Sequence, residues 1–204
     1  MEEKELVNGR ESHAEGKENQ RAGVKIVCLG DSLTWGFPFG PQFSWVSQVS
    51  QRYGLEMINR GINGDTTDGM LERFSDHVVR HCPTHVVIMG GTNDVIIRES
   101  LDRICYNWRQ LVETSCRQGI VPVVGLPIPL GWKEPEKRLA RLRRWLVDFA
   151  AERRIKVINF AAPFFDPETG EVREELLLDG GHPTVEGYAA MARQVDPAEL
   201  GWIK

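Results

Sequence analysis

Ser32 is the side chain of this sequence that is best placed to act as a nucleophile. The apolar run over residues 24–29 ends in Gly30 and Asp31, two turn-forming residues, so the sequence predicts a buried strand that stops directly before the serine. The hydroxyl then lies at the carboxyl end of a strand, the edge at which open α/β sheets bind ligands. A serine there attacks a carbonyl group only when a general base and donors for the developing oxyanion reach it, so the chain must provide both.

His182 is the candidate base, and Asp179 is its candidate partner. Gly180 and Gly181 separate the two and permit a tight turn that brings the carboxylate to one ring nitrogen. Asp179 would fix the tautomer, and the other ring nitrogen would take the proton of Ser32. The alternative to a catalytic role is that His182 occurs by chance in the loop before a helix. An aspartate three residues before a histidine is a weak signal unless a serine such as Ser32 accompanies it.

Donors for an oxyanion are predicted from three positions. The backbone N–H of Ser32 is the first, and the loop over residues 59–66 offers a second at Gly64, where the backbone approaches a ligand closely. The Gly-Gly-Thr-Asn-Asp segment over residues 90–94 offers the side-chain amide of Asn93. Ordinary turn chemistry is the alternative for each loop taken alone.

Alternating strands and helices are predicted to position these groups. The sequence predicts strands over residues 24–29, 55–59, 84–89, 120–126 and 155–160, and helices over residues 42–53, 66–81, 98–117, 135–153 and 185–194. This alternation is typical of an α/β fold, with a parallel sheet covered by helices on both faces and the flavodoxin-like strand order 2-1-3-4-5. The carboxyl ends of parallel strands meet at one edge, so residues far apart in sequence are expected to converge there.

Together, these segments resemble the four motif blocks of the SGNH, or GDSL-type, hydrolases. The resemblance covers residues 24 to about 195 and rests on Gly30-Asp31-Ser32-Leu33, Gly64, Gly91-Thr92-Asn93-Asp94 and Asp179-x-x-His182, in the family's order and spacing. No GxSxG motif is present, which argues against the α/β-hydrolase nucleophile elbow.

The resemblance implies a three-layer α/β/α sandwich and hydrolysis of carboxylic esters or thioesters. It implies Ser32 as nucleophile, His182 as base and Asp179 as the residue that orients the base. It also implies an oxyanion hole formed by the N–H groups of Ser32 and Gly64 and the side chain of Asn93. No metal ion or other cofactor is required by this chemistry.

The sequence therefore predicts a serine hydrolase that acts on small carboxylic esters through an acyl-enzyme. A thioesterase, a lysophospholipase and a carbohydrate acetylesterase are alternatives within the enzyme class. A non-catalytic, flavodoxin-like binding module is the alternative of a different class, and the intact serine, histidine and aspartate favour the enzyme over it.

Composition sets the limits of this prediction. The chain has 204 residues, of which 41% are hydrophobic and 26% charged, and its formal net charge is −4. These values favour one globular domain. They favour neither a nucleic-acid partner nor a membrane span, so a small ester is the expected partner. The oligomeric state is left open. We expect a flexible polar tail over residues 1–22 and a catalytic domain over residues 23–204. The tail lacks a signal-peptide pattern, so a cytoplasmic location is expected.

Two clusters of residues and one cysteine suggest other functional sites, but each has a simpler structural explanation. His77 and His81 are four residues apart on a predicted helix, as in a metal pair, but the segment lacks the glutamate of HExxH and no metal site is predicted. The basic residues between Lys137 and Arg144 are interpreted as the solvated face of a helix, with attraction of an anionic substrate as the alternative. Cys28, inside the first strand, is interpreted as a core residue.

Two loops are expected to flank the edge that carries Ser32. They span residues 35–45 and 127–132, and both are rich in aromatic residues and proline. They predict an apolar pocket for the acyl or alcohol group of the ester. Burial of Trp45 in the core is the alternative for that side chain.

Overall fold

Five parallel strands form the sheet, in the order β2-β1-β3-β4-β5. This computed structural model describes residues 23–203, so the predicted tail over residues 1–22 lies outside the described residues. The strands are β1 (Lys25–Gly30), β2 (Glu56–Gly61), β3 (His85–Met89), β4 (Val121–Gly125) and β5 (Lys156–Ile158). The predicted fold class and strand order are confirmed.

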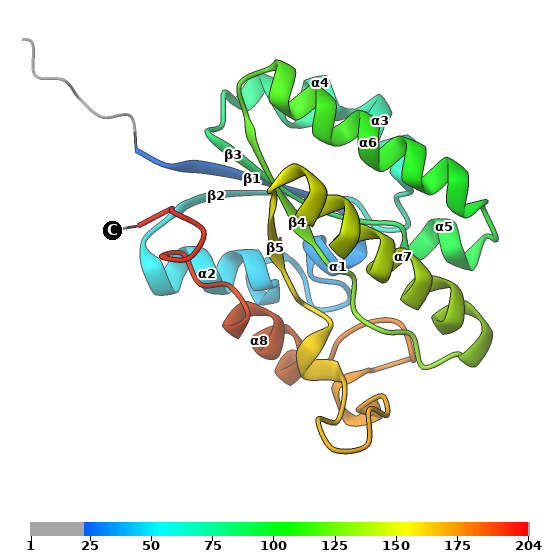
Figure 1. Cartoon of the computed structure of the whole chain (residues 1–204). Helices are drawn as coiled ribbons and strands as arrows, with labels where there is room; N and C mark the ends of the chain where they lie inside the picture. Colours follow the sequence, from blue (N-terminus) through cyan, green and yellow to red (C-terminus); the bar gives the residue numbers. More distant parts are fainter. Residues whose placement is uncertain (1–22, 204) are drawn as a thin grey trace, which may run out of the picture.

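Helices cover both faces of the sheet and make three layers, as Figure 1 shows. One face carries α2 (Trp45–Tyr53) and α8 (Val185–Arg193), which pack against each other. The other face carries α3 (Thr67–Glu72), α4 (Phe74–His77), α6 (Leu101–Arg117) and α7 (Lys133–Arg153). Among residues 23–203, no helix is long and apolar enough to cross a bilayer.

Side chains along each strand point alternately to the two faces of the sheet, so a separate hydrophobic core forms on each face. Cys28 of β1 is fully buried with Trp45 and Tyr188 on the α2–α8 side, whereas Val27 is buried with Trp108 on the other side. The core interpretation of Cys28 is thus confirmed, and burial raises the pKa of its thiol far above the usual range. Trp45 also belongs to the core, so only the remainder of the loop before it is free to flank the candidate site.

The strand register brings the candidate segments to one edge. The last residue of β1, Gly30, pairs with Gly61 on one side and with Met89 on the other. The three segments that follow these residues contain Ser32, Gly64 and Asn93, so they leave the sheet side by side. Ser32 begins the short helix α1 (Ser32–Trp35), and Asn93 lies in α5 (Thr92–Ile96).

One predicted helix is divided in the structure, and another begins later than predicted. The helix predicted over residues 66–81 is divided into α3, α4 and a 3₁₀ turn over Val79–His81, although Met70, Phe74 and Val78 face the core at the predicted spacing. Apolar spacing indicates the buried face, but it does not determine whether the backbone between the buried residues stays helical.

The other incorrect boundary lies at the amino end of the helix predicted over residues 98–117. There Arg98 has a left-handed backbone with a φ of 65°, and α6 begins only after Ser100, whose hydroxyl accepts from the N–H of Arg103 at 3.2 Å. Such an N-cap sets the start of a helix more strongly than periodicity does. The short helix α5, which precedes it, was not predicted.

A glycine at the end of β2 lets α1 lie directly on the sheet. A Cβ atom at Gly61 would lie 2.2 Å from the backbone nitrogen of Trp35 and 2.7 Å from the carbonyl oxygen of Asp31. Both are backbone atoms and cannot rotate away. The position of Ser32 therefore depends on the absence of a side chain at residue 61.

We expect Gly61→Ala to destabilise the fold by about 3 kcal/mol, the upper part of the range for overpacked sites, because α1 must move to admit the methyl group. Chemical denaturation measures the change, with Gly23→Ala as the matched control, since nothing lies within 4 Å of a Cβ there. Equal stability of the two variants would contradict the close packing of α1 on β2.

Asp31 is a buried carboxyl group at the start of α1. Its side chain caps the helix, because Oδ1 accepts from the N–H of Leu33 at 2.9 Å. Oδ2 is buried without a hydrogen-bond partner among the described residues. Burial first, and the nearby carboxylates of Asp65 and Asp94 to a lesser extent, raise the pKa of Asp31 to about 7.

This raised pKa makes stability depend on pH. Between pH 3.8, the ordinary pKa of an aspartate, and about pH 7, the native state holds the Asp31 proton and the unfolded chain has released it. The native state binds more protons in this window, so the contribution of Asp31 to stability falls as the pH rises through it. We expect the stability of the wild type relative to Asp31→Asn to fall by up to about 4 kcal/mol between pH 4 and pH 8. Urea denaturation of both proteins measures it; a pH-independent difference would show that Asp31 is ionised throughout.

Candidate active site

Ser32 and His182 lie within hydrogen-bond distance at the carboxyl edge of the sheet. Ser32 Oγ is 3.1 Å from His182 Nε2, although the residues are 150 positions apart in sequence. Ser32 is the first residue of α1 and is 6% exposed, so its hydroxyl is near the surface while its backbone is held by the turn after β1. The predicted pairing of a serine at this edge with a histidine is therefore present in the geometry.

The loop before α8 holds His182 through Asp179. Asp179 Oδ2 lies 2.8 Å from His182 Nδ1, and Oδ1 accepts from the backbone N–H groups of Gly181 at 3.0 Å and His182 at 2.8 Å. Gly180 makes this turn possible, because its φ is 82°. A short antiparallel bridge between Leu177 and Pro183 closes the base of the loop.

The protonation of Asp179 follows from these contacts. Partial burial raises its pKa, but the hydrogen bonds from the His182 ring and from the two backbone N–H groups outweigh burial and leave the pKa below the usual value. Asp179 therefore stays ionised at neutral pH. Its carboxylate accepts the proton on Nδ1, which leaves Nε2 as the acceptor facing Ser32.

Aromatic side chains fix the surroundings of this pair. The ring of Phe37 packs against that of His182 with centroids 4.7 Å apart. Tyr188 of α8 donates its hydroxyl hydrogen to the carbonyl oxygen of Phe37 at 2.8 Å, and its hydroxyl lies 3.4 Å from the carbonyl oxygen of Ser32. The sequence places Tyr188 on a helix face but gives no signal for this contact, which ties α1 to the helix that follows His182.

Gly64 and Asn93 lie in adjacent segments at the same edge. Gly64 has a φ of 77°, and no atom lies within 4 Å of where its Cβ would be. Asn93 donates from Nδ2 to the carbonyl oxygen of Asp65 at 2.8 Å. A side-chain amide has two N–H donors, so one of them fixes the side chain and the second stays available to a ligand.

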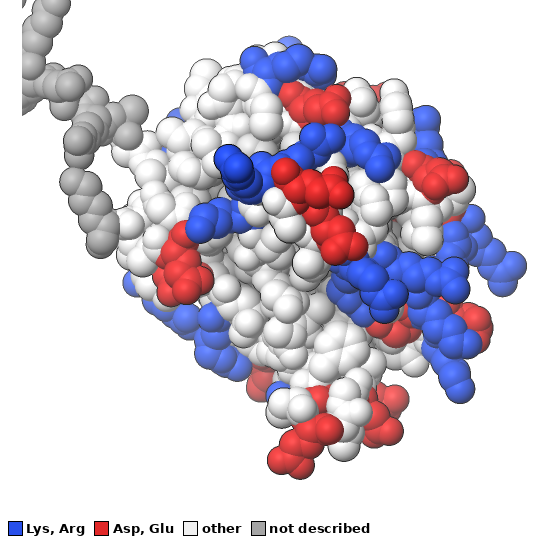
Figure 2. All heavy atoms as spheres, in the orientation of Figure 1, with Lys and Arg blue, Asp and Glu red and all other residues white. Residues whose placement is uncertain are grey.

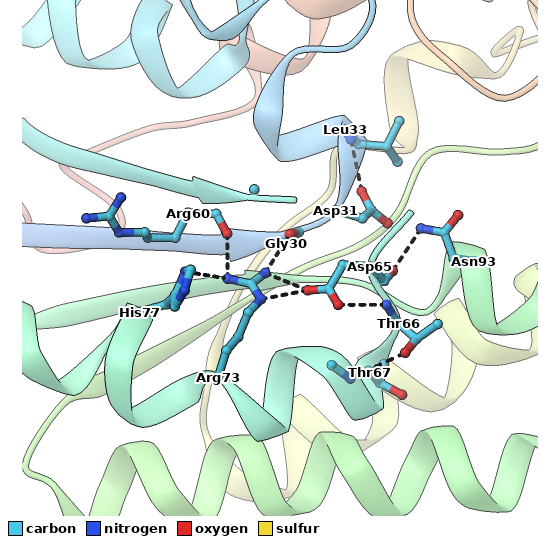
Figure 3. A network of polar contacts seen from close by, with 12 residues as sticks. Gly30, Asp31, Leu33, Arg60, Asp65, Thr66, Thr67, Arg73, His77 and Asn93 are labelled. Carbon is cyan, nitrogen blue, oxygen red and sulfur yellow. Dashed lines mark hydrogen bonds and ion pairs between the residues drawn. The ribbon is translucent and has the colours of Figure 1, made fainter. Parts of the chain in front are cut away.

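Figure 3 shows the guanidinium group of Arg73 at the centre of the network behind these segments. Arg73 donates to the carbonyl oxygens of Gly30 and Arg60, both at 3.0 Å, and pairs with the carboxylate of Asp65 at 2.6 Å. Only 11% and 10% of the Arg73 and Asp65 side chains are exposed, so this pair is largely desolvated. One cation therefore joins the end of β1, the end of β2 and the loop of Gly64.

The buried carboxylate of Asp94 holds the segment of Asn93 against neighbouring helices. Asp94 accepts from the hydroxyl of Thr67 at 2.5 Å and from its backbone N–H at 3.0 Å, while Asn107 donates to the same hydroxyl at 3.0 Å. These contacts join α5, α3 and α6. Sequence reasoning did not identify Thr67, Asn107 or Arg73, each of which has a partner more than 25 residues away in sequence.

The two histidines of the weaker metal hypothesis contact arginines instead. His81 Nε2 lies 2.7 Å from a guanidinium nitrogen of Arg60, and His77 Nδ1 lies 3.2 Å from one of Arg73. Burial first, and then these cations, lower the pKa of both histidines. Within residues 23–203, no group of three or more His, Cys, Asp or Glu side chains is arranged to hold a metal ion.

Exposed apolar side chains lie close in sequence to the candidate site residues. Ile62 precedes Gly64 by two residues, Ile97 follows Asn93 by four, and Leu178 precedes Asp179 directly; their exposed fractions are 40%, 66% and 54%. Trp132, from the predicted flanking loop, lies against Gly180 and is 44% exposed. Each candidate segment thus carries an exposed apolar side chain close in sequence to its site residue.

Comparisons with known proteins show which family this chain resembles. Residues 28–190 match the profile of the GDSL-like Lipase/Acylhydrolase family. The solved structure of a protein from Desulfitobacterium hafniense, described as belonging to the lipolytic G-D-S-L family, superposes with a TM-score of 0.78 at 28% identity, covering 84% of this chain and 97% of that one.

Two curated proteins are similar in sequence. Esterase TesA of Pseudomonas aeruginosa is 23% identical over 184 residues, which cover 87% of this chain and 89% of the esterase. The lipoprotein YqeF of Bacillus subtilis is 32% identical over 118 residues, 52% of this chain, and the match spans about half of that relative (49%). Because the family profile covers most of the chain and includes the segments of Ser32, Gly64, Asn93 and His182, the chain belongs to the GDSL-like lipase/acylhydrolase family of carboxylic ester hydrolases.

Proposed function

We propose that this protein hydrolyses small carboxylic esters through an acyl-enzyme formed on Ser32. The observation that carries the proposal is the hydrogen-bonded chain from Asp179 through His182 to Ser32, with distances of 2.8 and 3.1 Å. A serine hydroxyl is a weak nucleophile on its own, and an adjacent imidazole with a fixed tautomer activates it.

Acylation begins when Ser32 Oγ attacks the carbonyl carbon of the ester and His182 Nε2 accepts the hydroxyl proton. The negative charge that develops on the carbonyl oxygen is stabilised by the N–H groups of Ser32 and Gly64 and by the second N–H of Asn93. Asp179 stabilises the imidazolium ion. The tetrahedral intermediate then expels the alcohol, which takes its proton from His182.

Deacylation repeats these steps with water as the nucleophile. His182 removes a proton from the water molecule as it attacks the acyl-enzyme, and returns the proton to Ser32 Oγ when the acid leaves. Thioesters, lysophospholipids and acetylated sugars would pass through the same steps. The exposed apolar residues Ile62, Ile97 and Trp132 favour a small ester with an apolar acyl group.

We expect Ser32→Ala to lower the hydrolysis of p-nitrophenyl acetate, butyrate and octanoate by at least about a thousandfold, because no other group of the site replaces the nucleophile. Initial rates of nitrophenolate release measure the loss, and the wild-type rates across the three esters measure the acyl length that the site accepts. Ser75→Ala, at an exposed serine of α4, is the matched control. Ser32→Ala with the wild-type rate would refute the assignment of the nucleophile.

We expect Asn93→Ala to lower kcat by about a hundredfold or more, with a smaller change in KM, because the amide binds the oxyanion more strongly than the ground-state carbonyl. Asn93→Asp keeps the size of the side chain and removes both N–H donors, so it should lose at least as much. Steady-state kinetics on p-nitrophenyl butyrate, with thermal unfolding as a check on the fold, decide between the outcomes. An unchanged kcat in either variant would remove Asn93 from the oxyanion hole.

A further inference from the structure

The first half of α7 contains a largely buried ion pair outside the candidate active site. The sequence places Arg143 on a solvated basic face, but that interpretation is wrong for this residue, which is 8% exposed. Arg143 pairs with Glu136, whose side chain is 17% exposed. Figure 2 shows Lys, Arg, Asp and Glu side chains mixed over the surface on this side of the molecule. Unlike those charges, the pair is largely removed from water, so each member needs its partner.

Glu136 and Arg143 fix the buried loop that follows β4. Residues 126–130 of this loop are buried, so their backbone groups need partners within the protein. Glu136 Oε2 accepts from the N–H of Leu130 at 2.8 Å, and Arg143 donates to the carbonyl oxygen of Pro127 at 3.5 Å. Because Glu136 lies in the first turn of α7, the pair ties the loop to the helix that it leads into.

The residue that follows Leu130 holds the peptide group between Gly180 and Gly181. The N–H of Gly131 donates to the carbonyl oxygen of Gly180 at 2.7 Å. At the other end of the same peptide group, the N–H of Gly181 donates to Asp179 Oδ1 at 3.0 Å. A peptide group is planar, so its two ends rotate together. The hydrogen bond from Gly131 therefore keeps the Gly181 N–H directed at the carboxylate that orients the candidate base.

Trp132 covers the same turn. Atoms of its indole ring would lie 3.0 Å from a Cβ atom at Gly180 and 3.3 Å from one at Gly181, so the ring rests on backbone that carries no side chains. Glycine has more conformational freedom than any other residue, and a turn with two glycines needs contacts from outside to keep one conformation. The loop after β4 supplies those contacts.

We propose that Glu136 is a positioning residue for the catalytic base, His182. Together with Arg143 it fixes the loop after β4, and that loop fixes the glycine turn that carries the base. Without these contacts the turn would spend part of its time in conformations that hold Nε2 of His182 farther than 3.1 Å from Ser32 Oγ. The inference rests on the proposed function, because it adds a residue to the same proton transfer without placing that residue in contact with the ester.

The first test is Glu136→Ala, assayed on p-nitrophenyl butyrate. We expect kcat to fall at least about tenfold, because the base is within reach of the Ser32 hydroxyl for less of the time. KM should change by less than about twofold, because binding of the ground-state ester involves no proton transfer. Glu134→Ala is the matched control, since it removes an exposed glutamate from the same turn of α7 and should keep the wild-type kcat. An equal loss of kcat in both variants would overturn the inference.

Two further variants separate positioning from stability. Glu136→Met combined with Arg143→Met leaves no unpaired charge, and such apolar replacement of a buried ion pair often preserves stability. It still removes the acceptor of the Leu130 N–H, so kcat should fall as in Glu136→Ala. Leu146→Ala opens a cavity at a fully buried position in the second half of α7, so it should lower stability and keep kcat. A stably folded double variant with the wild-type kcat would overturn the inference.

A measurement that needs no catalysis reports on the turn itself. The N–H groups of Gly181 and His182 both donate to Asp179, and their hydrogen exchange is followed by NMR. We expect the double variant to speed both exchange rates at least about tenfold, because the turn opens locally, and Leu146→Ala to leave them unchanged. Unchanged exchange in the double variant would overturn the inference whatever the activity. Faster exchange in a protein whose wild type hydrolyses no ester would support the contact and count against the proposed function alone.

Discussion

The arrangement of the candidate active site depends on one largely buried guanidinium group. At the ends of β1 and β2, Arg73 donates to the carbonyl oxygens of Gly30 and Arg60 while it pairs with the carboxylate of Asp65. The carbonyl oxygen of Gly30 also accepts from the N–H of Ile62 at 3.0 Å, so Arg73 supplies its second hydrogen bond. Asp65 then holds Asn93 through its backbone carbonyl. Removal of Arg73 would leave the carboxylate of Asp65 largely buried without its partner, at a cost of about 3–5 kcal/mol in stability. The same guanidinium group therefore fixes both the loop of Gly64 and the turn before Ser32.

Three aspartates near Ser32 have pKa values shifted in different directions because their surroundings differ. Asp31 is fully buried with one oxygen unpaired, and its pKa is raised to about 7. Burial also raises the pKa of Asp94, although the hydrogen bonds of Thr67 oppose this. Asp179 is half exposed and accepts three hydrogen bonds, so its pKa is lowered. The only one of the three with a depressed pKa is the one that contacts His182, where an ionised carboxylate is needed to stabilise an imidazolium ion.

Much of the fold was predictable from local patterns. Short apolar runs indicated all five strands, and the alternation with helices indicated a parallel sheet and its order. The convergence of the segments of Ser32, Gly64 and Asn93 also followed, because they come after neighbouring parallel strands whose carboxyl ends lie at one edge. His182 lies in the loop before α8 and follows no strand directly, so its meeting with Ser32 was expected from the residue types. The division of residues 66–81 into shorter helices did not follow, since Met70, Phe74 and Val78 keep the same buried face with or without a continuous helix.

The sequence by itself determined the residue types of the site, the strand order and the edge at which the site lies, because these depend on spacing, turn formers and the handedness of connections. Only the tertiary structure decided how the site is held. Arg73 reaches Gly30 across 43 residues, and Tyr188 reaches Phe37 across 151. Such contacts arise when whole helices and strands pack together. The residues that neighbour Arg73 or Tyr188 in the sequence do not indicate which distant backbone group or charge that side chain will contact.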